Sequence, residues 1–236
     1  MKTVYVSTMH GIRRHGERSG WIQRLDRGAE RHRFALWVRS LLAIYDFDDF
    51  VGLDVPWWSF RSTDATAAFL SHRPDARVFE WGSGASTVWL AQRARSVTTI
   101  ENDPVWAAKI TAVIPGNGEL RVIPGSYGPG RVAGAVSARA GYEGVDFSDY
   151  VASIDNTDAL YDLIVVDGRA RGACLTAALD HLAPDGMIVF DNVDRRRNRR
   201  AVRALGPRFH VRTLRGLTPC LPYPTSTAVI THRVPA

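Results

Sequence analysis

The chain has 236 residues, of which 45% are hydrophobic and 23% are charged. This balance is typical of a globular α/β domain with a sizeable core. No apolar run approaches the roughly 20 residues that a membrane span needs, and the basic N-terminus lacks the apolar region of a secretory signal. The two cysteines, Cys174 and Cys220, suit a reducing compartment and show no metal-binding spacing, so we expect a cytoplasmic protein.

The net charge of +6 comes largely from two short segments. Residues 1–33 hold eight Lys or Arg against three acids, and residues 194–203 hold six arginines against one acid. Such segments favour acidic or phosphorylated partners, although a solvated surface is the simpler interpretation of each.

The first 62 residues are predicted to form a basic arm and a helical cap, followed by a main domain over 63–236. Residues 1–30 lack periodic apolar positions, which predicts partial disorder or an arm that faces a partner. Residues 34–45 show the apolar spacing of a helix. Residues 46–60 mix acids with aromatic side chains and are predicted to be a loop, and a short helix is expected over 63–70.

From residue 77 onward, β-rich apolar runs alternate with helical segments. The predicted strands are 77–81, 96–101, 120–123, 161–167, 186–191, 209–214 and 226–231, and the predicted helices between them are 86–94, 104–113, 170–182 and 193–205. The first five strands are continuous apolar runs, as buried parallel strands are. A Pro-rich loop joins the last two strands without room for a helix, so that pair should be antiparallel. The pattern predicts an α/β protein with a Rossmann-like, doubly wound, seven-stranded sheet that ends in an antiparallel hairpin.

Four acidic residues follow the ends of these strands. Glu80 precedes a glycine loop, Glu101 ends the second strand, Asp167 the fourth and Asp191 the fifth. The carboxyl ends of parallel strands meet at one edge of an open sheet, and ligands bind at that edge. We therefore expect all four acids to face one site.

The glycine loop after the first strand has the composition of a ligand-binding turn. Gly82 and Gly84 let the backbone turn tightly and approach a ligand, and Ser86 and Thr87 begin a helix whose free N–H groups favour an acidic ligand group. A dinucleotide loop would carry a third glycine where Thr87 stands, and a Walker loop would carry Gly-Lys-Ser/Thr, which is absent. A plain strand–helix turn is the alternative for the loop by itself.

The E-x-G-x-G-x-S pattern after the first strand and the acid that closes the second resemble the class I S-adenosylmethionine-dependent methyltransferases, over about residues 63–232. The resemblance implies that the loop contacts the methionine part of the cofactor, that Glu101 binds the ribose hydroxyls, and that the turn after the third strand lies near the adenine. The cofactor-binding residues that it implies are Glu80, Gly82, Ser83, Gly84, Ser86, Thr87, Glu101, Asn102, Ser126, Tyr127 and Asp167.

Asp167, Asp191 and Asn192 form a candidate metal site. A sugar or phenol hydroxyl releases its proton reluctantly, and a hard divalent cation lowers that cost. These three side chains supply oxygen ligands and no histidine adjoins them, which favours magnesium over zinc. The alternative is that Asn192 or Asp194 caps the following helix.

The trio also resembles the Asp…Asp-Asn metal site of catechol O-methyltransferase-like enzymes. In further motifs the chain resembles a bacterial group of sugar and natural-product O-methyltransferases. Here these motifs are Val166-Asp167-Gly168-Arg169-Ala170-Arg171, Cys174, Asp191 to Arg195, and Pro224-Thr225-Ser226. The catechol branch has a basic lysine where Ala170 stands, so the base is open between Asp167, Asp191 and metal polarisation without a protein base. Arg171 could steady an anionic acceptor or the alkoxide.

The acceptor site is predicted to include Trp57, Trp58, Tyr150 and Tyr223, because their aromatic faces suit sugar C–H surfaces as well as they suit a core. The long segment 128–160 is expected to hold a lid or an extra helix. The preferred function is O-methylation of a small hydroxylated molecule, with a sugar favoured over a phenol.

Two other functions stay open on the sequence. A metal-independent methyltransferase of nucleic acid or protein would use the arginine-rich helix, but the N/D-P-P-Y/F motif of nucleobase methylation is absent. A non-enzymatic binding module is disfavoured by the four strand-end acids. We therefore expect a small-molecule partner and neither a membrane nor a nucleic acid partner, and a homodimer is left open.

Overall fold

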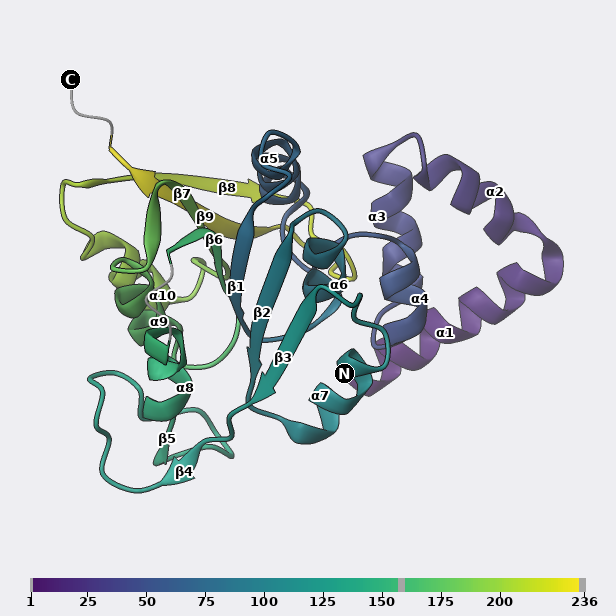
Figure 1. Cartoon of the computed structure of the whole chain (residues 1–236). Coiled ribbons are helices and arrows are strands. Elements are labelled where there is room, and N and C mark those ends of the chain that lie inside the picture. Colours follow the sequence, from purple (N-terminus) through teal and green to yellow (C-terminus); the bar gives the residue numbers. More distant parts are fainter. Residues whose placement is uncertain (1, 157–159, 234–236) are drawn as a thin grey trace.

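The computed structural model describes residues 2–156 and 160–233. Seven strands form one sheet in the order β3-β2-β1-β6-β7-β9-β8 (Figure 1). The strands are β1 (Arg77–Trp81), β2 (Ser96–Glu101), β3 (Gly118–Val122), β6 (Tyr161–Val166), β7 (Leu182–Phe190), β8 (Phe209–Gly216) and β9 (Thr225–His232). The first five are parallel, and β9 is antiparallel to both β7 and β8. The predicted doubly wound sheet with its C-terminal hairpin is confirmed.

The two faces of the sheet bury separate apolar cores. Side chains alternate across β1, so that Phe79 and Trp81 join the core beneath α8–α10, while Val78 joins the core beneath α5 and α6. The helices that follow or cover the strands are α5 (Phe60–Ser71), α6 (Ala85–Ala91), α7 (Pro104–Thr111), α8 (Ser148–Ala152), α9 (Arg171–Ala178) and α10 (Arg196–Arg203). Both faces are covered, as continuous apolar strands require.

The N-terminal segment is helical rather than disordered. It forms α1 (Lys2–Ser19), α2 (Trp21–Ala29), α3 (Arg33–Leu42) and α4 (Phe47–Gly52), which lie to one side of the sheet, nearest α6 and α7 (Figure 1). The expected partial disorder is wrong for residues 2–30, because Tyr5, Val6 and Met9 give α1 a sparse apolar stripe that packs against the cluster containing Leu36 and Ile44. The alternative, an arm that faces a partner, stays a prediction.

The predicted loop over 46–60 is also partly wrong. Asp46 accepts a hydrogen bond from the N–H of Asp49 and caps α4, whose Phe50 is buried. Helix α5 begins at Phe60, capped by Ser59, and crosses the division that we predict after residue 62. The apolar cluster of the N-terminal helices also includes Ala85 and Cys220 from the main domain. No helix in the described ranges has the length and apolar character of a membrane span.

The long segment after β3 contains small elements of its own. Strands β4 (Ser126–Tyr127) and β5 (Val145–Asp146) pair with each other, and α8 and the short 3-10 helix η1 (Ser153–Asn156) follow. The expected extra helix is therefore present as α8. Its Tyr150 and Val151 are buried in the core beneath β1 and β6.

Candidate active site

The glycine turn after β1 packs directly against the end of β6. Gly82 has φ 94°, and a Cβ built there would lie 2.6 Å from the Cα of Gly168. The N–H of Asp167 donates to the carbonyl of Trp81 at 2.9 Å, which extends the ladder to the turn. Only glycine suits this crossing. The turn after β1 and Asp167 after β6 are consequently neighbours.

Glu80 lies beneath the glycine turn with no exposed surface. Its carboxylate accepts hydrogen bonds from the hydroxyls of Ser86 at 2.5 Å, Thr87 at 2.6 Å and Thr99 at 2.9 Å. Thr87 in turn accepts from the N–H of Gly84 at 3.0 Å. Glu80 and Thr87 are thus placed to shape the loop from below rather than to touch a ligand.

The burial of Glu80 makes protein stability depend on pH. Burial raises its pKa from 4.5 to about 7, against the opposing effect of the three hydroxyl donors. The folded protein keeps this proton to a higher pH than the unfolded chain does, so stability should fall as pH rises from about 4.5 to 7. A pKa rise of this size corresponds to about 3 kcal/mol.

Glu80→Gln is therefore expected to match the wild-type protein near pH 5 and to exceed its unfolding free energy by about 2–3 kcal/mol at pH 8. Urea denaturation at both values measures the difference, and Glu30→Gln, at an exposed glutamate, is the control. Equal pH dependence in the wild type and Glu80→Gln would contradict an ionised, destabilising Glu80 at pH 8.

Glu101 organises the second side of the loop. One carboxylate oxygen accepts from the backbone N–H of Ser83 at 2.9 Å and from its hydroxyl at 2.8 Å. The other oxygen accepts from the backbone N–H groups of Asn102 at 2.7 Å and Asp103 at 2.9 Å. The indole of Trp106 donates to the carbonyl of Ser83 at 2.9 Å. Glu101 therefore fixes the loop, and its carboxylate also borders the adjoining cavity.

A cavity of about 790 Å³ opens above these residues, and we call it the glycine-loop cavity. Seven of the predicted cofactor-binding residues line it, namely Gly82, Ser83, Gly84, Ser86, Glu101, Asn102 and Asp167. Ser126 and Tyr127 do not line it. Both are exposed on the small β4–β5 ribbon, with Tyr127 82% exposed, and Tyr127 borders a separate hollow beside Asn102.

The N-terminal helices form one wall of the glycine-loop cavity. His10 of α1, Tyr45 and Phe47 line it together with the glycine turn, and Phe47 packs edge-on against Trp106 with ring centroids 5.2 Å apart. No motif in the sequence marks these residues, because His10 lies 72 positions before Gly82 and reaches the site only through the packing of α1.

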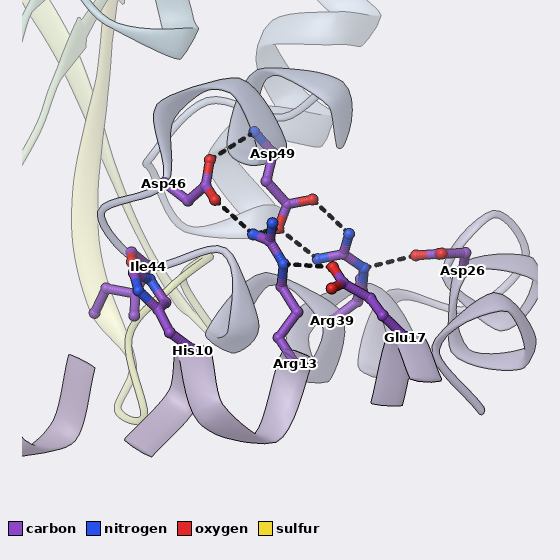
Figure 2. Close-up of polar contacts among 8 residues, drawn as sticks. All are labelled: His10, Arg13, Glu17, Asp26, Arg39, Ile44, Asp46 and Asp49. Carbon is purple, nitrogen blue, oxygen red and sulfur yellow. Dashed lines mark hydrogen bonds and ion pairs between the residues drawn. The ribbon is translucent and has the colours of Figure 1, made fainter. Parts of the chain in front are cut away.

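Ion pairs hold this wall in place, as Figure 2 shows. Arg13 donates to Asp46 at 2.6 Å and to Asp49 at 2.8 Å, and Arg39 donates to Asp49 at 2.9 and 2.5 Å and to Asp26 at 2.6 Å. The Nε2 atom of His10 also donates a hydrogen bond to the carbonyl of Ile44 at 2.7 Å. Because Arg39 is buried, its partners must be retained for the cap to stay folded.

Two carboxylates and a guanidinium meet at the ends of β6 and β7. Arg171 contacts Asp167 at 2.5 Å and lies 3.7 Å from a carboxylate oxygen of Asp191. It also donates to the backbone carbonyls of Asp167 at 2.7 Å, Asp191 at 2.9 Å and Gly168 at 3.1 Å. Arg171 is therefore a buried clamp across both strand ends, and most of its donors are already used within the protein.

The remaining partners of the two carboxylates come from distant elements. The indole of Trp58 donates to Asp167 at 3.2 Å, and the hydroxyl of Thr227 donates to Asp191 at 2.6 Å. The amide of Asn192, a residue at φ 59°, also donates to Asp191. Burial raises the pKa of Asp167, and burial together with the charge of Asp167 raises the pKa of Asp191 to about 7. Only when both carboxylates are ionised does the pair carry more negative charge than Arg171 alone balances.

A second cavity of about 570 Å³ opens over these carboxylates, and we call it the strand-end cavity. Asp167, Asp191, Asn192 and Tyr223 line it. It shares Trp57, Asp167, Arg171 and Arg195 with the glycine-loop cavity, so the two cavities adjoin. Partial burial and the nearby cations Arg171 and Arg197 lower the pKa of the Arg195 guanidinium.

The donor set at the strand ends suits a hard divalent cation. Two carboxylates with raised pKa values and one amide carbonyl present oxygen atoms, and extra positive charge would stabilise the ionised carboxylates. Within residues 2–156 and 160–233, no group of three or more His, Cys, Asp and Glu side chains is arranged to hold a metal ion. The candidate metal site therefore needs the amide of Asn192 as its third ligand.

The structure separates the four predicted acceptor residues into two groups. Trp57 and Tyr223 border the strand-end cavity, and Tyr223 is 57% exposed. Trp58 and Tyr150 have no exposed surface, so the expectation that they touch the acceptor is not met. Trp58 packs on Trp89 and orients Asp167, whereas the hydroxyl of Tyr150 fills the space beside Gly168, 2.0 Å from where a Cβ would be.

Comparison with known proteins gives a match to the main domain. Residues 79–193, just under half of the chain, match the family model described as a methyltransferase domain. No curated protein sequence matches the chain.

Solved structures resemble the chain in fold. An O-methyltransferase from Bacillus cereus in complex with S-adenosylhomocysteine aligns with a TM-score of 0.53 and 19% identity, over 72% of this chain and 81% of that one. A protein provisionally assigned as an O-methyltransferase, from Klebsiella pneumoniae, aligns with a TM-score of 0.50 and 18% identity, over 72% and 80%. A provisionally assigned rRNA methylase from Clostridium thermocellum aligns with a TM-score of 0.51 and 10% identity, over 76% and 100%.

Residues 79–193 therefore form a methyltransferase domain, which spans β1 to β7, and the sheet has the fold of the Bacillus cereus O-methyltransferase. At these sequence identities the solved structures show a shared fold and do not identify the methyl acceptor.

Proposed function

We propose that the protein transfers a methyl group from S-adenosylmethionine to a hydroxyl of a small molecule, with a divalent cation, magnesium by preference, held by Asp167, Asp191 and Asn192. The observation that carries this proposal is the junction of two cavities at Asp167 and Arg171. One cavity contains the glycine turn and Glu101, and the other contains the two carboxylates. A donor in the first and a hydroxyl in the second would meet at Asp167.

The glycine-loop cavity supplies groups suited to the methyl donor. Glu101 borders the cavity, and its carboxylate is buried. Ribose hydroxyls can bind this carboxylate if the Ser83 hydroxyl, which donates to it, moves away. The glycine turn brings backbone groups close to the methionine part. His10 and Phe47 close the opposite side, which limits water around the sulfonium.

The strand-end cavity supplies groups suited to the acceptor. Asp191 has a pKa near neutrality, as a general base should, and Asp167 lies at the junction where a proton would leave the hydroxyl. A bound divalent cation would lower the cost of ionising that hydroxyl. Arg171 holds both carboxylates in place and adds positive charge beside them. The aromatic faces of Trp57 and Tyr223 favour a sugar.

A methyltransferase of nucleic acid or protein is the second candidate, because α10 presents an arginine-rich surface. The small volume of the strand-end cavity, about 570 Å³, favours a small acceptor over a polymer.

Methyl transfer from radiolabelled S-adenosylmethionine to pools of hydroxylated sugars, phenols, RNA and peptides tests the proposal. We expect label in a sugar pool, loss of transfer in excess EDTA and recovery with added magnesium, because an alcohol proton is tightly held at neutral pH. Labelling of RNA or peptide alone would favour the second candidate. Full transfer in EDTA, with metal-free protein confirmed by elemental analysis, would remove the cation and leave Asp167 and Asp191 as the bases.

A further inference from the structure

The glycine-loop cavity contains more positive charge than its acids balance. Its cations are Lys109, Arg139, Arg169, Arg171, Arg195 and Arg197, and its acids are Asp46, Asp48, Glu101 and Asp167. Three of these acids are already engaged within the protein. Asp46 accepts from Arg13, Asp167 from Arg171, and Glu101 from four N–H and O–H donors.

Arg195 and Arg197 are the cations best placed to meet an acceptor. Arg195 borders both cavities at their junction, directly before α10, and Arg197 borders the glycine-loop cavity in the first turn of that helix. Both residues are exposed to solvent overall, and the Arg195 guanidinium is partly buried near Asp167 and Asp191. Among the described residues, neither guanidinium has a carboxylate partner within ion-pair distance. By contrast, Arg171 beside them is buried and paired.

We propose that Arg195 and Arg197 bind a phosphate group of the acceptor, so that the substrate class is a phosphorylated, hydroxylated small molecule. This inference rests on the proposed function, because it places the phosphate beside the hydroxyl that receives the methyl group. A phosphate monoester carries nearly two negative charges at neutral pH, which two unpaired guanidinium groups balance. Each planar guanidinium can also donate two parallel N–H bonds to phosphate oxygens.

The same helix provides a matched control. Arg200 and Arg203 also lie on α10 and are exposed, but they border neither cavity. If the arginines of α10 only form a solvated surface, removing either pair of charges should have the same effect on phosphate binding. If Arg195 and Arg197 form a site, only their removal should weaken phosphate binding.

The test uses the full chain loaded with S-adenosylhomocysteine, at low and constant ionic strength. Inorganic phosphate and acetate are titrated separately while NMR follows the arginine Nε–H signals. The variants are Arg195→Gln/Arg197→Gln and Arg200→Gln/Arg203→Gln. We expect the wild-type protein to bind phosphate, the first double variant to bind it at least tenfold more weakly, and the second to stay within twofold of wild type.

Several results would overturn the phosphate site. These are no phosphate binding by the wild type, equal weakening in both double variants, or acetate binding as tight as phosphate binding. A loss of S-adenosylhomocysteine affinity confined to Arg195→Gln/Arg197→Gln would also overturn it, because the arginines would then hold the carboxylate of the methyl donor. Failure of the wild type to bind S-adenosylhomocysteine would instead contradict the proposed function, and the titrations of unloaded protein would still decide the phosphate site.

Discussion

Replacing Asp191 with asparagine is expected to slow methyl transfer by about a thousandfold while leaving S-adenosylhomocysteine affinity nearly unchanged. Asp191 borders the strand-end cavity and not the glycine-loop cavity, so its charge acts on the acceptor side. The substitution keeps the size of the side chain and lets Thr227 keep a hydrogen-bond partner. It removes one of the two carboxylates that would hold the cation or take the proton.

A metal-binding readout separates these two roles of Asp191. Electron paramagnetic resonance with Mn²⁺ in place of magnesium should show binding to the wild-type protein and loss of binding in Asp191→Asn. The control is Asp185→Asn, because Asp185 lies on the same strand, β7, before its buried end. Retained Mn²⁺ binding with lost transfer would assign Asp191 to proton removal alone, whereas retained transfer would contradict any essential role.

Replacing Glu101 with alanine is expected to weaken S-adenosylhomocysteine binding by about 1–3 kcal/mol, or roughly fivefold to 150-fold, as measured by calorimetry. The structure gives two reasons for the loss. The ribose would lose a charged acceptor, and the N–H groups of Ser83, Asn102 and Asp103 would lose their partner. The second effect would loosen the glycine turn even without a direct contact.

An S-adenosylhomocysteine analogue that lacks one ribose hydroxyl distinguishes direct contact from loop support. If Glu101 binds that hydroxyl, the alanine variant should lose less affinity for the analogue than for the parent compound. Ser83→Ala is the companion variant, because it removes only the hydroxyl that competes for the carboxylate and should leave affinity unchanged or slightly higher. Equal losses for the analogue and the parent would assign Glu101 to loop support alone.

The strand ends were predictable from sequence because local pattern and chemistry coincide there. Continuous apolar runs define the buried parallel strands, and Glu101, Asp167 and Asp191 mark where they stop. Parallel topology then gathers those ends at one edge, as the register of β1, β2, β6 and β7 confirms. The glycine turn could also be predicted from local sequence, because its positive φ angle falls on a single residue, Gly82.

The surroundings of the site could not be derived in this way. An aromatic side chain near a loop has no periodicity that tells core from cavity, so Trp57 and Trp58 look alike in sequence, yet one borders both cavities and the other has no exposed surface. The wall formed by His10 depends on ion pairs such as that of Arg13 with Asp49, which link residues 36 positions apart. Such contacts follow from tertiary packing alone.

The backbone crossing of Gly82 and Gly168 has a consequence for the entropy of the proposed reaction. The donor side and the acceptor side are joined by main chain in van der Waals contact, with the hydroxyl of Tyr150 filling the remaining space. The relative position of the two sides is therefore set by the folded main chain. Alignment of donor and acceptor is the dominant requirement of an in-line displacement, and a rigid crossing meets that requirement before either ligand arrives.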